Sequence, residues 1–423
     1  MRKLRAVLVA INVCGYHSLA LGYLKAYALK DEALRQAVDI EIIDFCTDCN
    51  NPRQILYYLA RKKPDLVGIS CYCWGMNQVV EICAQFKSIL PKAALVLGGP
   101  EASPIAEAWL VRLPGVDAVV KGEGEATFAA LLSALAHKRN LKEVAGLAFR
   151  DGNQLCITAP QPLIDDLNEI PSPYLTGVLP PREGVTYLET FRGCPFRCAY
   201  CYEGKNFPKL RYFDPERTRA EVEWLARSGQ VQTFSFVDSV FNLRPSKTAE
   251  LAEIIATAGR GRCRLHTIEV VAETITEKTI DAFRRAGVNS VEMGPQTVNP
   301  ATLKNVHRFH NPERFGKALR LLRQAGIRTL CDLIVGLPGD DFFKVLNSAR
   351  TVFSHAPDRV VFSILHVLPG TYLWEHGGEK YGLTFDPKPP HIAVGCRSFP
   401  FEDMVRAEVM CKALDREYNL HLQ

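Results

Sequence analysis

The chain has 423 residues, 47% of them hydrophobic, which is enough for two or three domains with buried cores. Its net charge of +5 arises from interspersed acidic and basic residues, so no basic face indicates nucleic-acid binding. No apolar run is long enough to span a membrane, and the short apolar stretch near the start is typical of a buried strand, not a signal peptide. We therefore expect a cytoplasmic protein without nucleic-acid or membrane partners.

The first 145 residues alternate short apolar runs with helical patterns. Strands buried on both faces and joined by helices predict an α/β domain with a doubly wound parallel sheet. Such sheets bind ligands beyond the carboxyl ends of their strands. Two of those ends carry Gly98, Gly99, Gly122 and Glu123, where glycines let a ligand approach the backbone and a helix N-terminus can receive an anion. The alternative is that these glycines only make tight turns.

Residues 146–182 are rich in proline and turn residues, which predicts an extended connection between domains. About six strand-then-helix units follow over residues 183–385. Because a closed barrel has eight such units, we expect a partial, open (β/α)6 barrel with its chemistry at the carboxyl ends of the strands. Residues 386–423 are expected to form a C-terminal extension.

Three cysteines, Cys194, Cys198 and Cys201, lie in one short polar segment directly after the first predicted barrel strand. Cysteine thiolates hold iron–sulfur clusters, and a cubane cluster normally takes four of them. Three ligands therefore leave one iron open to a substrate or cofactor. A zinc ribbon would need a second cysteine pair at short spacing, and a redox Cys-x-x-Cys pair would not need Cys194. We interpret the segment as the site of a [4Fe–4S] cluster.

The fourteen cysteines are many for a cytoplasmic protein. Several others, including Cys14, Cys71 and Cys331, lie in apolar stretches, where a free thiol behaves as a small hydrophobic side chain. Without a secretion signal, we expect no disulfide framework and a reducing compartment.

The Cys-x3-Cys-x2-Cys spacing, with Tyr200 before the third cysteine, closely resembles the signature of radical S-adenosylmethionine (SAM) enzymes. The resemblance implies that the amine and carboxylate of SAM chelate the open iron, and that an electron from the reduced cluster cleaves SAM to a 5′-deoxyadenosyl radical. It also implies a small-molecule substrate and an electron donor such as flavodoxin or ferredoxin. Residues 4–137 look like the cobalamin-binding domain that precedes many of these enzymes.

Polar residues at the ends of the later strands are candidates for binding SAM, each with the ordinary alternative of a helix cap or a turn former. These residues are Asp238, Glu269, Gln296 and Asp332.

One departure concerns the lower face of the cobalt. Related domains that place a histidine there use an Asp-x-His-x-x-Gly loop, which this sequence lacks. The first loop offers only His17, and the second offers Cys46 and Cys49. Either cobalamin binds without a histidine ligand, through backbone contacts to its nucleotide tail, or the domain is a relic.

The leading hypothesis is radical methyl transfer to a poorly activated centre, in which cobalamin relays a methyl group from one SAM while a second supplies the radical. One alternative needs no cobalamin and transfers a 3-amino-3-carboxypropyl or other SAM-derived group, with a thiophilic acceptor near Cys331, Cys396 or Cys411. Another is a non-catalytic corrinoid or iron–sulfur binding protein, against which the complete cysteine triad argues. The sequence does not identify the substrate.

Overall fold

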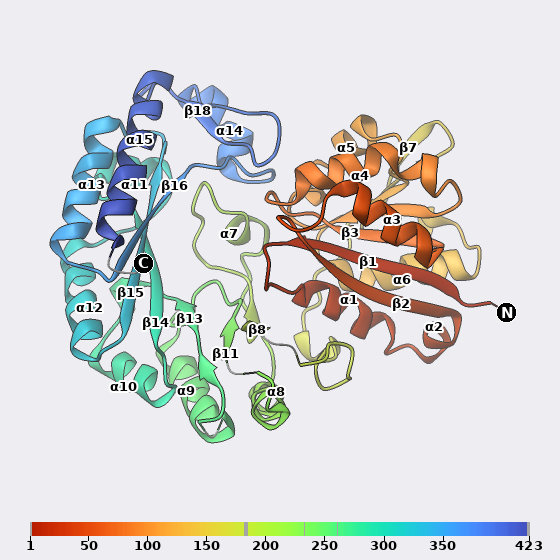
Figure 1. Ribbon diagram of the computed structural model, residues 1–423, viewed down its shortest axis with the longest axis horizontal. Helices are drawn as coiled ribbons and strands as arrows, with labels where there is room; N and C mark the ends of the chain where they lie inside the picture. The colour runs from red at the N-terminus through yellow and green to blue at the C-terminus, as the bar shows by residue number, and fades with distance from the viewer. Residues whose placement is uncertain (1, 182–184, 232, 260, 421–423) are drawn as a thin grey trace. The chain divides into compact units, whose positions relative to one another are not determined.

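The computed structural model describes residues 2–181, 185–231, 233–259 and 261–420. The chain folds into two compact units, the first ending at Pro180 and the second beginning at Pro181 (Figure 1).

A seven-stranded sheet, counted over the described residues, forms the centre of the first unit. Its strands are β1 (Leu4–Asn12), β2 (Val38–Cys46), β3 (Leu66–Ser70), β4 (Ala94–Gly98), β5 (Ala118–Val120), β6 (Leu147–Asp151) and β7 (Gln154–Ile157). They lie in the order β2-β1-β3-β4-β5-β6-β7, and the first five are parallel while β6 and β7 pair antiparallel. The continuous apolar runs of β1, β3 and β4 are buried, as expected for strands covered on both faces.

Helices cover both faces of this sheet (Figure 1). They are α1 (Leu19–Ala28), α2 (Glu32–Ala37), α3 (Pro52–Lys62), α4 (Met76–Ile89), α5 (Ala106–Arg112) and α6 (Gly124–Ala136), with short 3-10 turns η1 (Ser103–Ile105), η2 (Leu141–Glu143) and η3 (Leu167–Glu169). α3, α4 and α5 pack into one apolar core, and α1, α2 and α6 pack into another with the opposite side chains of the strands. The predicted doubly wound parallel sheet is confirmed.

The segment 146–182, expected to be an extended connection, differs from that expectation. Its first residues form β6 and β7, which lengthen the sheet at the β5 edge. The chain after β7 also belongs to the first unit, since Lys30 Nζ donates to the Glu169 carbonyl at 3.0 Å. The predicted boundary at 182 and 183 lies outside the described residues.

Parallel strands also organise the second unit. They are β8 (Val185–Leu188), β11 (Thr233–Phe236), β12 (Arg264–Leu265), β13 (Thr267–Glu269), β14 (Ser290–Gln296), β15 (Arg328–Val335) and β16 (Arg359–Ile364). β12 and β13 are separated only by His266; β12 pairs with β11, and β13 pairs with β14. Parallel pairing therefore runs in chain order from β8 to β16 through six positions in the described part of the chain. This arrangement confirms the partial (β/α)6 barrel.

The remaining elements of the second unit surround these strands or connect them. The helices are α7 (Glu203–Asn206), α8 (Pro215–Ser228), α9 (Pro245–Gly259), α10 (Glu277–Arg285), α11 (Pro300–Asn305), α12 (Pro312–Gln324), α13 (Phe342–Ser354), α14 (Tyr372–Tyr381) and α15 (Phe401–Tyr418), with the turn η4 (Ala272–Thr274). The short strands are β9 (Phe191–Arg192), β10 (Arg211–Tyr212), β17 (Thr384–Phe385) and β18 (Ala393–Gly395).

Helix ends follow their sequence signals. In α8, Asp214 caps the N-terminus, Pro215 occupies the first turn, and Gly229 ends the helix in a left-handed conformation. The predicted C-terminal extension contains β18 and α15, and buried Met404 and Cys411 of α15 join an apolar core with Val335 of β15. The extension is therefore part of the folded second unit.

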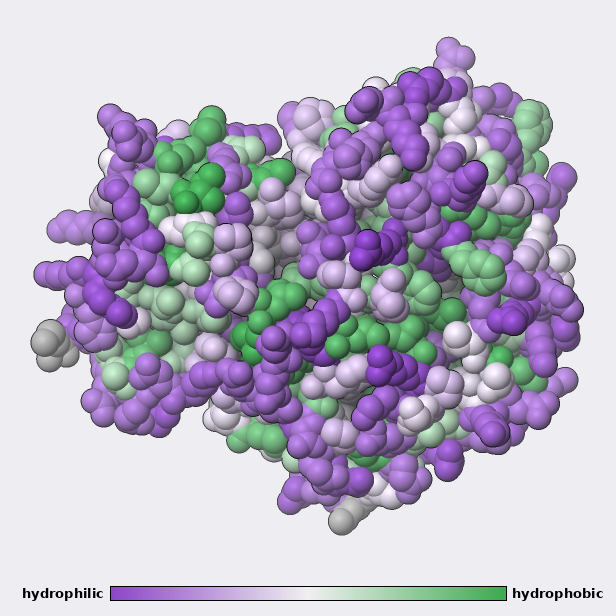
Figure 2. Space-filling model, turned by 180° about the vertical axis from the view of Figure 1, so that it is seen from behind, coloured by the Kyte–Doolittle hydropathy of each residue, from purple (hydrophilic) through white to green (hydrophobic). Residues whose placement is uncertain are grey.

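Hydrophilic side chains cover much of the face seen in Figure 2, with apolar side chains in smaller patches among them. This distribution agrees with the interspersed charges of the sequence. Over the described ranges, no helix combines the length and the apolar character needed to cross a membrane.

Candidate cluster and cofactor sites

The loop that carries the cysteine triad runs from β9 to β10, which pair antiparallel and close its base. Cys194 N donates to the Phe207 carbonyl at 3.0 Å within the loop. Ala199 ties the middle of the loop to the rest of the unit: its N–H donates to the Val306 carbonyl at 2.9 Å, and its carbonyl accepts from Leu373 N at 2.9 Å. The loop is thus fixed at its base and at its centre.

Cys194 and Cys198 are buried, and Cys201 is partly buried. All three belong to the described residues, yet their sulfur atoms do not all lie within 4.8 Å of one another. A single tetrahedral zinc ion would bring them to about 3.8 Å apart, since a Zn–S bond is about 2.3 Å long. The wider spread fits a cluster of several irons better than one metal ion.

Arg308 gives Cys198 a cationic neighbour. Its Nη1 donates to Cys198 Sγ at 3.4 Å, and its Nη2 donates to the Gly294 carbonyl. Burial opposes the charge on Arg308, but interactions with Tyr200 and Cys198 outweigh it, so the pKa of Arg308 is raised. This contact places a positive charge beside one of the three predicted cluster ligands. Tyr200 itself is enclosed, and burial raises the pKa of its hydroxyl.

Three carboxylates lie on adjacent barrel strands: Glu269 ends β13, Glu292 lies in β14 and Asp332 lies in β15. Glu269 and Glu292 are direct neighbours in the parallel register. The side chain of Glu269 is accessible to solvent at its surface. The protein around its carboxylate removes part of the water shell, and this desolvation, together with the charges of Glu292 and Glu203, raises the pKa of Glu269 to about 7. The pKa of Asp332 is raised as well, mainly by burial and to a smaller extent by the charge of Glu292. Arg308 offsets part of the rise in the pKa of Asp332, and we name Glu269, Glu292 and Asp332 the carboxylate cluster.

Gln296 ends β14, where the register with β15 shifts after Met293. Its φ of 64° is left-handed, which is uncommon for a residue other than glycine. Gly294 makes room for it, because a Cβ at Gly294 would clash with the Gln296 side chain. Oε1 of Gln296 is buried and has no hydrogen-bond partner among the described residues. A buried acceptor of this kind fits a site that a ligand's donor completes.

Asp238 follows β11 and has different surroundings. Its carboxylate accepts from Thr190 N at 2.8 Å, from Thr190 Oγ1 at 2.5 Å and from Phe191 N at 3.4 Å. Burial raises its pKa to about 7. These contacts anchor the chain where it enters β9 and the cysteine loop, which favours a positioning role for Asp238 over direct contact with SAM.

The sequence predictions missed Glu292 and Arg308. A signal for Glu292 existed, because side chains alternate along a strand and Glu292 has the same parity as Gly294 and Gln296. No local signal identifies Arg308, which lies 110 residues from Cys198 in the chain. Only the folding of the second unit brings these two together.

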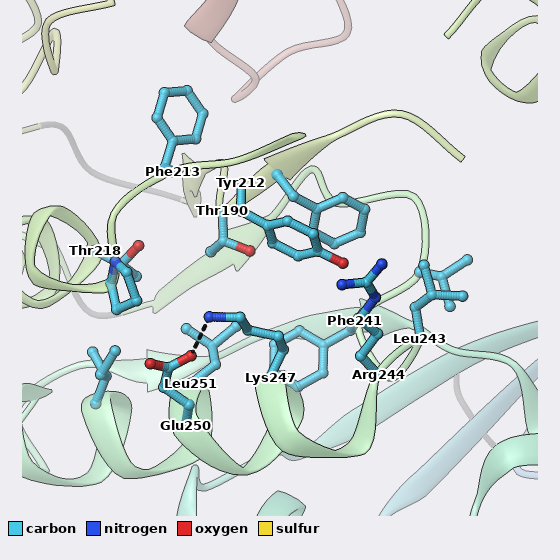
Figure 3. Close-up of a pocket in the computed structure, with 14 residues that line it drawn as sticks. Thr190, Tyr212, Phe213, Thr218, Phe241, Leu243, Arg244, Lys247, Glu250 and Leu251 are labelled. Atoms are coloured by element: carbon cyan, nitrogen blue, oxygen red, sulfur yellow. Dashed lines mark hydrogen bonds and ion pairs between the residues drawn. The ribbon is translucent and has the colours of Figure 1, made fainter. Parts of the chain in front are cut away.

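A separate pocket lies at the base of the cysteine loop (Figure 3). The Tyr212 ring has Arg244 and Lys247 near it, at 5.3 and 5.8 Å from its centroid, and Lys247 pairs with Glu250 at 2.7 Å. Thr190, which Asp238 anchors, forms another wall. No predicted SAM-binding residue lines this pocket, so it is distinct from the predicted cofactor site.

In the first unit, the glycines at the ends of β4 and β5 differ in what constrains them. Gly99 has φ 101°, and an added Cβ would meet the Cys71 carbonyl oxygen at 2.8 Å, so the chain's own backbone requires glycine there. Gly122 has φ 75° and open space beside it. Gly98 has neither constraint, since a Cβ there would meet Val120 only at 3.7 Å. The room at Gly98 and Gly122 fits close approach of a ligand to this edge.

Two further residues, Glu123 and Trp74, lie in the loops that follow strands of this sheet. Glu123 precedes α6, and its carboxylate accepts from Ile164 N at 3.3 Å, which ties down the segment after β7. Trp74, in the loop after β3, is 51% exposed, stacks on Tyr72 at 4.4 Å and donates to the Ile11 carbonyl at 3.2 Å. An exposed aromatic surface of this kind suits a large planar ring system such as a corrin.

Cys14 and Cys46 form a disulfide, with their Cα atoms 4.9 Å apart. The sequence predicted a free Cys14 and no disulfide framework, and the structure corrects that prediction for this pair. β1 and β2 pair in parallel with Asn12 opposite Cys46, so the loops that follow both strands meet. Apolar neighbours in the sequence could not reveal this contact, because it depends on strand pairing.

Two protein families match the chain. Residues 188–352 match the radical SAM superfamily, and residues 14–132 match the B12-binding domain. The first range contains the cysteine triad and the carboxylate cluster. The second contains Gly98, Gly99 and Gly122 at the ends of β4 and β5. The chain therefore combines a B12-binding domain with a radical SAM domain. The cofactors that these domains imply are a [4Fe–4S] cluster, SAM and cobalamin.

Several curated proteins are similar over most of the chain. An uncharacterised methyltransferase of Pyrococcus horikoshii is 28% identical over 85% of this chain and 78% of its own length. The cobalamin-dependent radical SAM methyltransferase TokK of Streptomyces tokunonensis is 26% identical, over 92% of this chain and 59% of its own. An anaerobic magnesium-protoporphyrin IX monomethyl ester cyclase of Synechocystis is 28% identical, over 66% and 57%. The chain thus spans less than two thirds of the last two relatives.

Among solved structures, the radical SAM methyltransferase TsrM of Kitasatospora setae matches with a TM-score of 0.72 and 19% identity, over 90% of this chain and 78% of TsrM. The cobalamin-dependent radical enzyme OxsB matches with a TM-score of 0.74 and 17% identity, over 97% and 67%. At these identities the similarity establishes a shared fold.

The unpartnered amide of Gln296 leads to a first prediction. An amide that offers both a donor and an acceptor suits a ribose diol. Gln296→Ala should weaken SAM binding to the cluster-loaded protein by about 1–3 kcal/mol, measured by equilibrium dialysis, with the iron–sulfur absorption unchanged. Gln324→Ala, at an exposed position, is the matched control. Equal SAM affinity in the Gln296 variant and the wild type would leave Gln296 with only its role at the strand end.

The carboxylate cluster predicts a pH dependence. Because the folded-state pKa of Glu269 is raised to about 7, the ligand-free fold favours its protonated form and should lose stability as pH rises through that value. A bound sulfonium favours the ionised carboxylates, so SAM affinity should increase over the same rise in pH.

Titration of SAM binding between pH 6 and pH 8, a range about one unit either side of that pKa, tests this prediction. Glu292→Gln removes a charge that raises both neighbouring pKa values, and should move the transition to lower pH. A pH-independent affinity in the wild type would exclude the cluster as the group that responds to the cation.

Gly98 and Gly99, at the end of β4, predict different effects of the same substitution on cobalamin uptake and on stability. Gly98→Val should reduce cobalamin uptake while leaving the thermal unfolding of the cobalamin-free protein nearly unchanged, because an added Cβ would meet Val120 only at an ordinary contact distance of 3.7 Å. Gly99→Val should instead destabilise the first unit even without cobalamin, since φ and Cys71 both exclude a side chain. Wild-type cobalamin affinity in a folded Gly98→Val protein would contradict a corrin-binding role for this edge.

Proposed function

We propose that this protein is a cobalamin-dependent radical SAM methyltransferase that acts on a small molecule. The observation that carries the proposal is the presence in one chain of a three-cysteine loop, which leaves one cluster iron open, and a B12-binding domain whose ligand edge has room at Gly98. The names of the relatives from Pyrococcus horikoshii and Streptomyces tokunonensis support methyl transfer as the reaction.

When bound, the cluster and cobalamin supply the electron that cleaves SAM and the site that relays its methyl group. The protein's own residues hold and orient these groups. Cys194, Cys198 and Cys201 would bind three irons, and Arg308 donates from Nη1 to the Cys198 sulfur. Gln296 would receive a ribose hydroxyl of SAM at its unpartnered Oε1.

The carboxylate cluster provides the charge that SAM needs. SAM carries a positively charged sulfonium, and Glu269, Glu292 and Asp332 lie on neighbouring strands, where Arg308 offsets only part of the rise in the pKa of Asp332. Glu292 and Asp332 are partly buried, which strengthens the attraction between their carboxylates and a bound cation. Ion pairing with SAM would therefore favour the charged state of Glu269 and Asp332 at neutral pH.

The alternative in which a carboxypropyl group passes to a thiophilic acceptor has little support in the structure. Cys331 and Cys411 are buried, with 0% and 2% exposure, and Cys396 is 8% exposed. Burial raises the pKa of Cys411 to about 12, so its thiolate is scarce at neutral pH. None of these cysteines presents an accessible sulfur near the triad.

The electron donor, such as flavodoxin or ferredoxin, and the cytoplasmic location belong to the same proposal. The reductive cleavage of SAM requires one electron per event, which a separate redox protein would deliver. The identity of the donor rests on the sequence resemblance.

The decisive experiment follows the methyl group. Reduced, cluster-loaded protein with cobalamin is incubated with methyl-deuterated SAM and a small-molecule extract, and products are analysed by mass spectrometry. Radical methyl transfer should give a deuteromethylated product together with both S-adenosylhomocysteine and 5′-deoxyadenosine. Cys198→Ala should abolish 5′-deoxyadenosine, and omission of cobalamin should abolish the labelled product. Formation of 5′-deoxyadenosine alone, at the same rate with and without cobalamin, would overturn methyl transfer and leave a radical SAM enzyme of another reaction type.

A further inference from the structure

Three sulfur atoms gather at one end of the sheet in the first unit. Cys14, Cys46 and Cys49 place their Sγ atoms within 4.8 Å of one another, and the sulfurs of Cys14 and Cys49 are 3.4 Å apart. In the part of the chain that the structure describes, this is the one group of three or more cysteine, histidine or acidic side chains that converges so closely. It lies outside the radical SAM triad.

The fold brings these cysteines together from two loops. Cys14 lies just beyond β1, and Cys46 and Cys49 lie at and just beyond the end of β2. The parallel register sets Asn12 opposite Cys46, and Thr47 N donates to the Asn12 carbonyl at 2.8 Å. Strand pairing therefore fixes the positions from which all three sulfurs start.

The second loop is held by its own hydrogen bonds. Cys46 N donates to Asn50 Oδ1 at 2.9 Å, and Asn50 N donates to the Cys46 carbonyl at 3.0 Å. Gln78 of α4 donates from Nε2 to the carbonyls of Thr47 at 2.8 Å and Asn50 at 3.1 Å. These bonds fold the segment from Cys46 to Asn50 into a fixed turn, so that Cys46 and Cys49 face the same point.

We propose that Cys14, Cys46 and Cys49, in their reduced form, are ligands of a zinc ion. In tetrahedral zinc sites the thiolates are about 3.8 Å apart, which the observed grouping can reach with small side-chain rotations. The spacing Cys46-x2-Cys49 is that of the paired ligands in structural zinc sites. Two of the three sulfurs are exposed, so the metal can enter from solvent.

The first loop also offers His17 as a fourth ligand, although its ring nitrogens lie outside the close group of three sulfurs. It lies three residues after Cys14, so that the first loop contributes a Cys-x2-His pair and the second a Cys-x2-Cys pair. The Nδ1 of His17 is 3.5 Å from Asp44 Oδ2, and Asp44 is itself held by Ser18 N at 3.0 Å. A carboxylate on one ring nitrogen is the usual partner of a histidine whose other nitrogen binds zinc. A turn of the imidazole about its side-chain bonds is required to bring that nitrogen to the sulfurs.

The disulfide in the structure is the oxidised, metal-free form of this site. A dithiol reductant transfers two electrons and two protons to the Cys14–Cys46 bond, and the dithiol becomes a disulfide. Zinc then displaces the protons of the three thiols that it binds. Oxidation of Cys14 and Cys46 removes two of the ligands, so zinc occupancy follows the thiol redox state.

The test measures two metals in the same full-length protein. Cluster-loaded wild type is reduced with dithiothreitol, desalted anaerobically, dialysed against zinc with a competing chelator, and analysed for zinc and iron by mass spectrometry. About one zinc and about four irons per chain are expected. Cys49→Ser should lower zinc affinity by more than about 100-fold with iron unchanged, since it removes a ligand itself. Cys156→Ser, in β7 of the same unit, should retain both metals.

Two further measurements separate the site from misfolding and from the cluster. Cys198→Ala should lose iron and keep zinc, which excludes zinc in the radical SAM triad. Diamide oxidation of the Cys198→Ala protein should restore the Cys14–Cys46 disulfide and release zinc with Cys49 still in place. The proposal is overturned if reduced wild type takes up no zinc, if Cys49→Ser binds zinc as tightly as wild type, or if the oxidised protein retains the metal.

Discussion

Parallel strand pairing is the constraint on which the chemistry of both units depends. It brings the carboxyl ends of successive strands to a common edge, so residues distant in sequence become neighbours wherever strands end. In the second unit this edge assembles the carboxylate cluster from three strands and places Gln296 beside it. In the first unit the same rule joins the loops after β1 and β2 and aligns Gly98 and Gly122 at the ends of β4 and β5.

The edge alone would not hold a cluster loop in one conformation. The structure adds anchors at separate points: Asp238 accepts from Thr190 and Phe191 before the loop, β9 pairs with β10 at its base, and Ala199 bonds to Val306 and Leu373 at its centre. Burying the Asp238 carboxylate raises its pKa, so this anchor costs stability as pH rises through about 7. A fixed loop in turn keeps the three thiols spread for a multi-iron cluster.

The charged side chains of the second unit also lie on or beside the parallel strands. The cysteine loop has the guanidinium of Arg308 beside Cys198, while the barrel strands carry carboxylates that suit a positively charged ligand. These preferences complement a cluster and a cationic cofactor that share one site. Arg308 also interacts with Asp332, lowering the pKa that burial raises, so the two halves of the site are electrostatically linked.

Much of the fold of this protein could be predicted from local sequence. The alternation of buried strands and capped helices predicted a doubly wound sheet and a partial barrel, because period and end signals are properties of neighbouring residues. The spacing of Cys194, Cys198 and Cys201 predicted a cluster with an open iron for the same reason. Residues at strand ends were also predictable, since a strand's end is a local feature, and the position of Gln296 at the end of β14 was predicted in this way.

The tertiary structure alone decided which of those residues are available to a ligand. Asp238 and Glu123 proved to be engaged by the chain's own backbone, and Gly99 proved to be required by Cys71. Antiparallel β6 and β7 joined the first sheet although their sequence borders a proline-rich segment. The contacts of Arg308 with Cys198, and of Cys14 with Cys46, cross large distances in sequence. Such contacts depend on strand order and register, which are set by the packing of whole units. They therefore cannot be predicted from any short stretch of residues.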